Sequence, residues 1–476
     1  MKKQFLIIII VLSFSGLNAQ QYHDPSYFPL AVWWQTTSVA AQYRDAGINM
    51  YVTGEQLTAT TLGTLKAADM KVICCQYPYP LSQVGDKTIY GWIHYKDEPD
   101  NSNPDYYGDC TPTSVVINNY KTMKAADPTR PVFLNLGMGV SYLNWVGRGG
   151  ACANQWWQYA DTITGHGAVR NGYIKASDII SYDIYPVNSK YAAVSGNLYY
   201  VPKGVDSLKS WSKLKERPTW TCIETTQYTS GSVLNRTPTP TEVKAEVWMA
   251  IIHGATGITY FAHKTYPVFI ETALLQDGFM LAAVKEINLQ ITAIASVINS
   301  PTLKSFATRS SSNASVPVDI MSKYYNGSNY IFAVPMRTGS TTVTFTTTNT
   351  VATSVEVLGE NRSIPIVNGV FTDDFSDYQV HLYKMNQNTG IETYQMFDSK
   401  IYPNPFKTSA TIDLTTQNNF PYELSVTDLQ GRLLQRTSIN SCKYTLNRNE
   451  LSEGMYLYSL RDNKNRVVSN QKFFIE

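Results

Sequence analysis

The chain of 476 residues is longer than one small hydrophobic core supports, and its length alone predicts two or three domains. Hydrophobic residues make up 43% of the chain and charged residues 16%, a globular composition that excludes extended disorder. The formal net charge is +2 and the Lys and Arg residues are scattered, so nucleic acid is not an expected partner.

The first twenty residues, MKKQFLIIIIVLSFSGLNAQ, combine a positive start, an apolar run and a small residue, Ala19, near their end. This pattern is typical of a Sec signal peptide and is too short for a spanning helix with its own flanks. No cysteine follows the cleavage region, so a bacterial lipid anchor is not indicated. We expect residues 1–20 to be a signal peptide and the mature protein to be exported and soluble.

Export permits disulfides without requiring them. Cys74, Cys75 and Cys222 lie in apolar, strand-like runs, where a cysteine is most simply a small buried side chain. Cys110 and Cys152 lie in polar segments and either pair or remain free thiols. Because no CxxC or HExxH spacing occurs, we expect no zinc site and no cofactor.

Residues 21–300 alternate short apolar runs with helix-like segments. The runs cover residues 30–35, 49–53, 71–75, 90–97, 131–137, 179–186, 218–226 and 257–263. Such alternation indicates a parallel sheet covered by helices on both faces. Eight units predict an α/β fold of the (β/α)8 TIM barrel type. An open doubly wound sheet is the alternative, which the missing glycine-rich dinucleotide turn disfavours.

From residue 301 the pattern changes to short alternating strands separated by Gly, Asn and Asp. Residues 301–386 therefore predict an all-β, sandwich-like accessory domain. A polar linker, residues 387–399, leads to a second small β unit at residues 400–476.

The last unit carries a family resemblance. The run Tyr402-Pro403-Asn404-Pro405, the segment DLQGRLL, the strand LSEGMYLYSL and a terminal basic-then-apolar strand resemble the C-terminal sorting domain of the type IX secretion system. The resemblance implies that the secretion machinery is a partner and that the chain crosses the outer membrane of a Bacteroidetes-type bacterium, often with removal of the tail. The residues alone would indicate a small β-sandwich, for which a sugar-binding module is the alternative.

Catalytic groups of TIM barrels lie at the carboxyl ends of the strands. Two of these ends carry a glutamate: Glu98, in KDEPD after the fourth run, and Glu224, in TCIETTQ of the seventh. Two carboxyl groups facing across a pocket can hydrolyse a glycoside, and a retaining enzyme holds them about 5–5.5 Å apart. The charge of Asp97 would raise the pKa of Glu98, and donors such as Tyr185 would keep Glu224 ionised. The alternative is a polar loop and an ordinary salt-bridge partner.

The same segments resemble clan A retaining glycoside hydrolases. GWIHYKDEPD on the fourth strand, IETTQ on the seventh and EVWMAIIHGATGITYFAH leading into the eighth carry the resemblance over residues 28–300. It implies that Glu98 is the acid/base and Glu224 the nucleophile. Asp97 departs from the usual Asn of the clan, which leaves the sugar open.

Further residues are candidates for binding the substrate. His263 ends the eighth run and either contacts substrate or is packed, and Asp183 either holds a sugar hydroxyl or caps a loop. Tyr185 either steadies Glu224 or is part of an aromatic wall. Trp33 and Trp34 end the first run, so one of them should point into the mouth, where aromatic rings stack on sugars.

We therefore predict a secreted, monomeric retaining glycoside hydrolase, found outside the cell or on its outer surface. It would cleave a β-linked polysaccharide of β-glucan or β-galactan type, with β-1,3-glucan as the first guess, by double displacement and without a metal or organic cofactor. A surface glycan-binding protein on an inactive barrel is the main alternative. A lyase or transglycosylase would keep both acids and form other products.

Overall fold

The computed structural model describes residues 24–101, 110–145, 158–161, 172–227, 231–386, 399–414, 421–429, 431–462 and 467–476. The predicted signal peptide, Cys152 and most of the predicted linker lie outside these residues. The chain divides into two compact units, with the boundary between residues 387 and 388.

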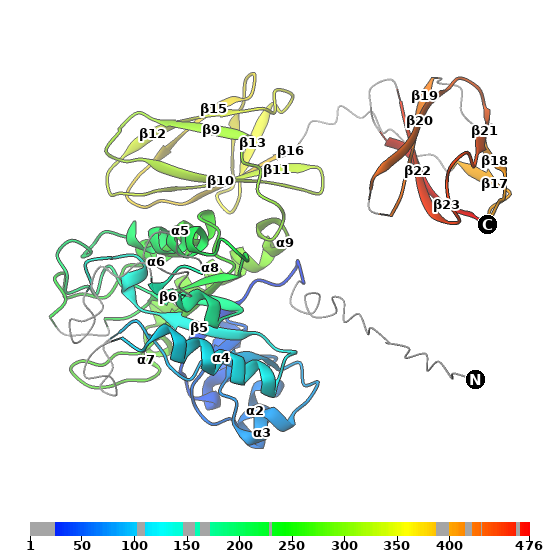
Figure 1. The fold of residues 1–476 in the computed structure, drawn as a ribbon. Coiled ribbons are helices and arrows are strands. Elements are labelled where there is room, and N and C mark those ends of the chain that lie inside the picture. Colours follow the sequence, from blue (N-terminus) through cyan, green and yellow to red (C-terminus); the bar gives the residue numbers. More distant parts are fainter. Residues whose placement is uncertain are drawn as a thin grey trace, which may run out of the picture. The chain divides into compact units, whose positions relative to one another are not determined.

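Eight strands of the first unit form a closed parallel barrel in chain order (Figure 1). They are β1 (Leu30–Trp33), β2 (Met50–Val52), β3 (Lys71–Cys74), β4 (Ile89–Ile93), β5 (Val132–Leu136), β6 (Ile179–Asp183), β7 (Thr219–Glu224) and β8 (Gly257–Phe261). Each strand pairs with the next, and β8 closes the ring on β1 with Leu30 opposite Ile258. The predicted TIM barrel is confirmed.

Helices follow the strands and surround the barrel (Figure 1). They are α1 (Ala40–Asp45), α2 (Ala59–Ala67), α3 (Pro78–Ser82), α4 (Thr113–Ala126), α5 (Tyr200–Trp211), α6 (Pro240–Ile252), α7 (Ala273–Gln276), α8 (Gly278–Ala293) and α9 (Ala295–Ile298). The sequence defines the start of α6 well: Thr239 and Glu242 form a reciprocal capping box, and Pro240 is the first helical residue.

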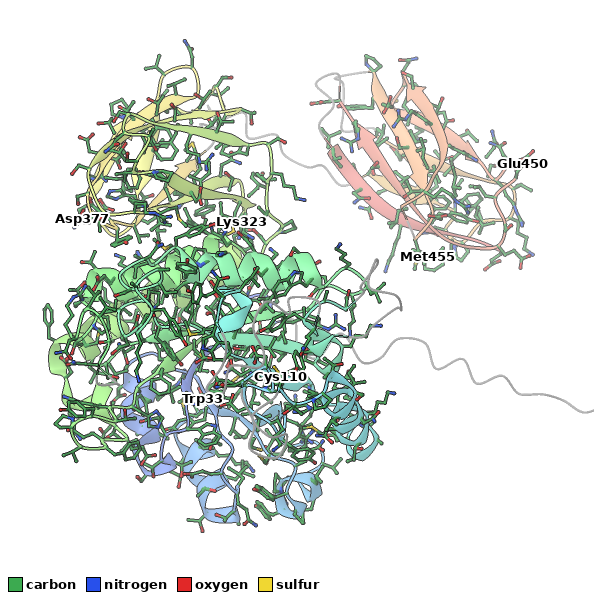
Figure 2. All side chains as sticks on the ribbon, turned by 60° about the vertical axis from the view of Figure 1, so that its left-hand side comes forward. Trp33, Cys110, Lys323, Asp377, Glu450 and Met455 are labelled. Atoms are coloured by element: carbon green, nitrogen blue, oxygen red, sulfur yellow. The ribbon has the colours of Figure 1, made fainter. Side chains whose placement is uncertain are left out.

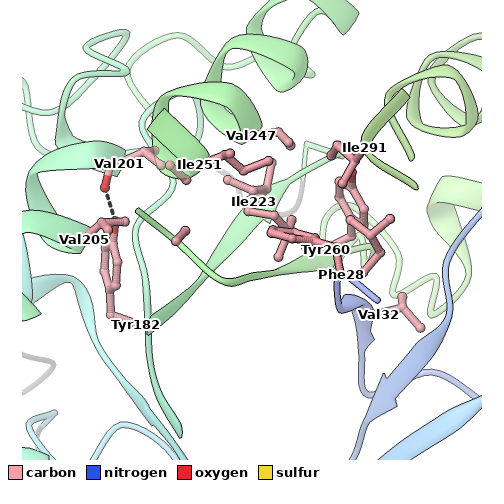
Figure 3. Packing of buried hydrophobic residues seen from close by; sticks show 14 of the residues in the cluster. Phe28, Val32, Tyr182, Val201, Val205, Ile223, Val247, Ile251, Tyr260 and Ile291 are labelled. Atoms are coloured by element: carbon pink, nitrogen blue, oxygen red, sulfur yellow. Dashed lines mark hydrogen bonds between the residues drawn. The ribbon is translucent and has the colours of Figure 1, made fainter. Parts of the chain in front are cut away.

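Alternate residues of the strands face the barrel interior and the surrounding helices. Ala31 and Trp33 belong to an interior cluster, whereas Leu30 and Val32 belong to the larger cluster between strands and helices. The interior cluster consists of Ala31, Trp33, Met50, Val52, Ile73, Ile93, Phe133, Ile179 and Trp220. Figure 3 shows the outer layer, where Ile223 of β7 lies beside the apolar residues of α6. The barrel is thus a packed core, and its mouth is left for chemistry.

The accessory domain consists of two antiparallel sheets, ordered β10-β11-β16-β13-β14 and β15-β12-β9. Its strands are β9 (Ala307–Ser311), β10 (Val318–Tyr325), β11 (Ser328–Pro335), β12 (Thr341–Thr347), β13 (Ser354–Val357), β14 (Arg362–Pro365), β15 (Val370–Phe375) and β16 (His381–Asn386). An aromatic core joins the sheets, in which the ring of Phe345 on β12 lies 5.2 Å from the ring of Tyr383 on β16. This agrees with the predicted sandwich.

The accessory sheets pack on the helical layer of the barrel. The ring of Trp248 on α6 lies 5.2 Å from the ring of Phe332 on β11. The ammonium group of Lys323, which Figure 2 labels, donates to the carbonyl oxygen of Ser300 at 2.6 Å. The barrel and the accessory sheets therefore share one continuous core.

The second unit is also built from antiparallel sheets, ordered β17-β18-β21 and β20-β19-β22-β23. The strands are β17 (Lys400–Tyr402), β18 (Ser409–Asp413), β19 (Tyr422–Thr427), β20 (Leu433–Ile439), β21 (Lys443–Asn447), β22 (Gly454–Arg461) and β23 (Val467–Ile475). Across the described residues of the whole chain, none of the helices has the length and apolar character to cross a membrane.

Candidate active site

The loop after β4 carries the DEPD motif. The strand ends at Ile93, short of the predicted end at residue 97. The backbone N–H of His94 donates to Phe133 O (2.8 Å), and the N–H of Glu98 donates to Asn135 O (3.1 Å). Two residues of β5 therefore face four residues of the loop, so residues 95–97 form a bulge. The bulge returns Glu98 to β5 with a φ of 45°.

A buried histidine fixes this loop to the helical layer. His94 Nδ1 accepts the backbone N–H of Lys96 at 3.2 Å, so the proton is on Nε2, which donates to the carbonyl oxygen of Val116 at 3.0 Å. Burial lowers the pKa of His94, and the ring stays neutral. His94 therefore acts on the loop as an anchor to α4.

Carboxyl groups from two strand ends meet at the barrel mouth. Asn135 Nδ2 lies 3.2 Å from Asp97 Oδ1 and 3.5 Å from Asp183 Oδ1, and so connects the β4 loop with the end of β6. Asn101 Nδ2 donates to Glu98 Oε2 at 2.8 Å. The structure thus brings together three residues predicted from the sequence, Asp97, Glu98 and Asp183. We call these three residues the carboxyl cluster.

Two members of the carboxyl cluster, Asp97 and Asp183, have raised pKa values. Burial, followed by the charges of Glu98 and Asp97, raises the pKa of Asp183 well above its usual range, and a hydrogen bond to Glu98 raises it further. A hydrogen bond between two carboxyl groups requires a proton on one of them, and the raised pKa of Asp183 makes Asp183 the donor in its hydrogen bond to Glu98. The surrounding protein and the charge of Glu98 also raise the pKa of Asp97 to about 7, although part of this residue is exposed.

Asp100, the last residue of the motif, was not singled out from the sequence. It is buried; its Oδ1 accepts the backbone N–H of Gly137 at 2.8 Å and its Oδ2 accepts the hydroxyl of Tyr159 at 2.9 Å. Burial raises the pKa of Asp100 to about 7, against the hydrogen bond from Gly137 and together with the charge of Glu98. Asp100 thus attaches the loop to the end of β5, and its position in DEPD was the available signal.

Gly137, directly after β5, lets two side chains approach each other. A Cβ atom at this glycine would lie 2.6 Å from the Trp145 ring and 3.2 Å from Glu98 Oε1. The indole of Trp145 and the carboxyl group of Glu98 therefore both approach the space above Gly137 and lie beside each other.

Glu224 ends β7 in a closed environment. It is fully buried, and its carboxylate accepts the backbone N–H groups of Val187 (2.6 Å) and Asn188 (2.9 Å) and the side-chain amide of Asn188. Burial raises the pKa of Glu224 to about 7, while these hydrogen bonds act to lower it. Burial, and then the charge of Glu224, raise the pKa of Glu246 on α6 well above its usual range. The donors from the β6–α5 connection were not predicted, because nothing in their residue types identifies them.

Tyr185, predicted to steady Glu224, lies in an aromatic contact. Its ring is 5.2 Å from the ring of Phe261 at the end of β8, and a hydrogen bond from Tyr185 lowers the pKa of Cys222, which burial raises well above its usual range. Tyr185 therefore belongs to the wall of the mouth between β6 and β8.

The remaining predicted residues gather at the end of β1. The rings of Trp33 and Trp34 stack at 5.8 Å; Trp33 is buried in the barrel interior and Trp34 is 42% exposed. The backbone oxygen of Trp34 accepts a hydrogen bond from His263 Nε2 at 2.9 Å. Burial lowers the pKa of His263, so its ring is neutral. Trp34 is thus the tryptophan of the pair that reaches solvent.

Cysteine and metal chemistry is limited in the described part of the chain. Cys110 is disulfide-bonded, and Cys152, with which the sequence left pairing open, lies outside the described residues. Cys74 and Cys222 are buried thiols. Among the described residues, no three His, Cys, Asp or Glu side chains are arranged to hold a metal ion.

Comparison with known proteins identifies the C-terminal unit. Residues 400–476 match the family model described as the secretion system C-terminal sorting domain. This confirms the predicted type IX sorting domain and indicates secretion, to the outer surface or the extracellular space. No curated protein matches the sequence.

Several solved structures are similar to the chain. An α-amylase from Anoxybacillus shares 10% identity, with 78% of this chain and 100% of that chain covered and a TM-score of 0.44. A proposed α-galactosidase from Bacteroides fragilis shares 10% identity over 76% and 79%, with a TM-score of 0.45. An endoxylanase from Clostridium papyrosolvens shares 13% identity over 75% and 96%, with a TM-score of 0.37.

Proposed function

We propose that the chain is a secreted glycoside hydrolase that cleaves a β-linked polysaccharide outside the cell. The observation that carries the proposal is the carboxyl cluster at the carboxyl-terminal mouth of the barrel, where Asn135 bridges Asp97 and Asp183, and Asp183 hydrogen-bonds to Glu98. Glycoside hydrolysis needs a protonated carboxyl group beside an ionised one, and burial together with mutual charge separates the two states.

In the proposed reaction Glu98 is the acid/base and Glu224 the nucleophile. Glu98 gives its proton to the glycosidic oxygen while the Glu224 carboxylate attacks the anomeric carbon, so that the C–O bond to the leaving group breaks and a glycosyl ester forms. Glu98 then removes a proton from water, which attacks the ester and releases Glu224. Asp183 supports this cycle because it holds a proton within hydrogen-bonding reach of Glu98.

Asp183 is a competing candidate for the nucleophile. Glu224 is fully buried and already accepts three N–H donors, which stabilise its ionised form but enclose it. Asp183 lies with Glu98 in the carboxyl cluster. Glu224 is the proposed nucleophile because an ionised nucleophile needs such donors.

The same burial favours a second candidate function. If Glu224 stays enclosed, the barrel would bind a glycan without cleaving it. The exposed ring of Trp34 at the mouth would serve such a binding protein equally well.

The test is release of reducing ends from a panel of β-1,3-glucan, mixed-linkage β-glucan, β-galactan and xylan by the full mature chain. We expect one polysaccharide to be cut and Glu98→Gln to lower the rate by about 10²–10⁴-fold. Glu224→Gln and Asp183→Asn identify the nucleophile, since the variant lacking it should be the more severely impaired. Glu216→Gln, an exposed carboxylate elsewhere on the barrel, is the matched control. Binding of a glycan without release of reducing ends would favour the binding protein instead.

A further inference from the structure

A short hairpin beside the barrel mouth exposes aromatic side chains. The backbone N–H groups of Lys264 and Ile270 donate to each other's carbonyl oxygens at 3.0 and 2.7 Å and close the loop that follows β8. Within it Tyr266 is 53% exposed and Phe269 is 61% exposed. With Val268, which is 67% exposed, these rings form a contiguous exposed apolar patch, and such patches mark interaction sites on soluble proteins.

The hairpin is attached to the rim of the barrel rather than projecting freely. The side-chain amide of Gln35, after β1, donates to the carbonyl oxygen of Glu271 at 2.8 Å. The ring of Phe269 stacks on the ring of His263 at 5.9 Å and 25°. These contacts hold the exposed face in one orientation.

Aromatic rings continue from the hairpin toward the carboxyl cluster. His263 lies 5.1 Å from Phe261, and Phe261 lies 5.2 Å from Tyr185, ring centre to ring centre. Tyr185 is two residues from Asp183 in the chain. The row of rings Tyr185, Phe261, His263 and Phe269 thus runs from the end of β6 past β8 to the hairpin tip.

We infer that the exposed hairpin rings of Tyr266 and Phe269 are a platform for a neutral polysaccharide, extending beyond the bond that is cleaved, and that the packed rings of His263 and Phe261 connect this platform to the barrel mouth. The exposed hairpin residues 265–269 carry no charged side chain, which suits an uncharged ligand. Sugar rings present apolar C–H faces that stack on flat aromatic groups. Continuity with the carboxyl cluster favours a glycan over a second copy of the chain or a lipid surface. The inference rests on the proposed function and adds that the substrate is a polymer engaging several rings.

Affinity gel electrophoresis of the full mature chain tests the platform, with the same four polysaccharides in the gel. The Glu98→Gln background prevents turnover during the run. We expect one polysaccharide to retard the protein, and Tyr266→Ala and Phe269→Ala each to weaken binding by about three- to tenfold. Phe279→Ala, which removes a 77% exposed ring from α8, is the matched control and should leave binding unchanged.

Each outcome separates the platform from the catalytic proposal. Equal retardation of Phe269→Ala and the control overturns the platform, even if the wild type releases reducing ends. Retardation that depends on Phe269 without any release of reducing ends supports the platform and removes the catalytic proposal. Two other outcomes would also overturn the platform, provided that retardation in the gel is unchanged in Tyr266→Ala and Phe269→Ala. A changed oligomeric state of these variants would assign the hairpin to contact with a second copy of the chain. Loss of their binding to phosphatidylethanolamine vesicles would assign it to a lipid surface.

Discussion

The position of Glu98 is determined mainly by the backbone conformation of its loop. Its φ of 45° is uncommon for a residue with a Cβ atom, and the surrounding structure imposes it through the bond to Asn135 and the anchoring of His94. Asp100 completes the support by binding the amide of Gly137. Loop residues that do not contact the proposed substrate thus determine where the proposed acid lies.

Glu246 provides a residue-scale test of the buried acids. Among the described residues, neither carboxyl oxygen of Glu246 has a hydrogen-bond partner. Burial raises the pKa of Glu246 well above its usual range, and the charges of Glu224 and Glu242 raise it further. A carboxyl group whose folded pKa is raised stabilises the fold below its unfolded pKa, near 4.3, and that stability is lost as pH rises through the folded value. We expect Glu246→Gln to raise the free energy of unfolding by about 1–2 kcal/mol at pH 8 and to change it little at pH 4.

The matched control for this prediction is Glu242→Gln on the same helix. Burial acts to raise the pKa of Glu242, but its bonds to Arg236 and Thr239 lower it overall, so its stabilisation is present above the unfolded pKa. The control should therefore destabilise the fold at pH 8, by about 1 kcal/mol. Thermal unfolding at the two pH values measures both variants. Loss of stability in Glu246→Gln at pH 8 would show that Glu246 is needed in its ionised form.

At the scale of elements, α5 packs unusually closely on β6. A Cβ atom at Gly204 would lie 2.3 Å from the ring of Tyr182, whose hydroxyl donates to the carbonyl oxygen of Val201 (Figure 3). The glycine is thus required by a strand-to-helix contact. It is not required by backbone conformation.

We therefore expect Gly204→Ala to destabilise the fold by about 1–3 kcal/mol through overpacking. Gly63 in α2 meets nothing within 4 Å, so Gly63→Ala should stabilise the helix by about 0.5–1 kcal/mol. Chemical unfolding of the two variants provides the measurement. Equal effects of the two substitutions would mean that Tyr182 can move aside.

The elements were largely predictable from the sequence, and the site was predictable only in part. Strands buried on both faces give continuous apolar runs, so the residue types predict the barrel. The bulge before Glu98 could not be predicted, because a straight strand would show the same change from apolar to polar residues at positions 93–97. Asn135 and the donors at residues 187 and 188 come from segments far from the glutamates, and only folding reveals that they converge.

At the scale of the whole molecule, one histidine connects the barrel with the accessory sheets. His253 Nδ1 lies 2.8 Å from Asp206 on α5, and its Nε2 lies 3.3 Å from Asp319 on β10, which Arg309 also contacts. Burial alone would lower the pKa of His253, but the two aspartates raise it to about 9. The connection is therefore charged at neutral pH.

Because the folded pKa is raised above the unfolded value, near 6.5, this stabilisation is fully present below pH 6.5 and lost as pH rises through about 9. We expect His253→Gln to lower the free energy of unfolding by about 1–3 kcal/mol at pH 6 and by much less at pH 10. Thermal unfolding at both pH values is the measurement. A loss of equal size at both values would mean that the charge of His253 contributes nothing.

The central claim is that Glu98 protonates the leaving group of a glycoside. The most direct measurement compares Glu98→Ala on the polysaccharide cut by the wild type and on the dinitrophenyl glycoside of the same sugar. The leaving group of the polysaccharide is a sugar alkoxide, which departs poorly unless an acid protonates it, whereas dinitrophenolate departs without protonation. We predict a loss of about 10²-fold or more on the polysaccharide with glycosyl transfer from the dinitrophenyl substrate largely retained. Equal losses on both substrates, or none on either, would contradict the assignment.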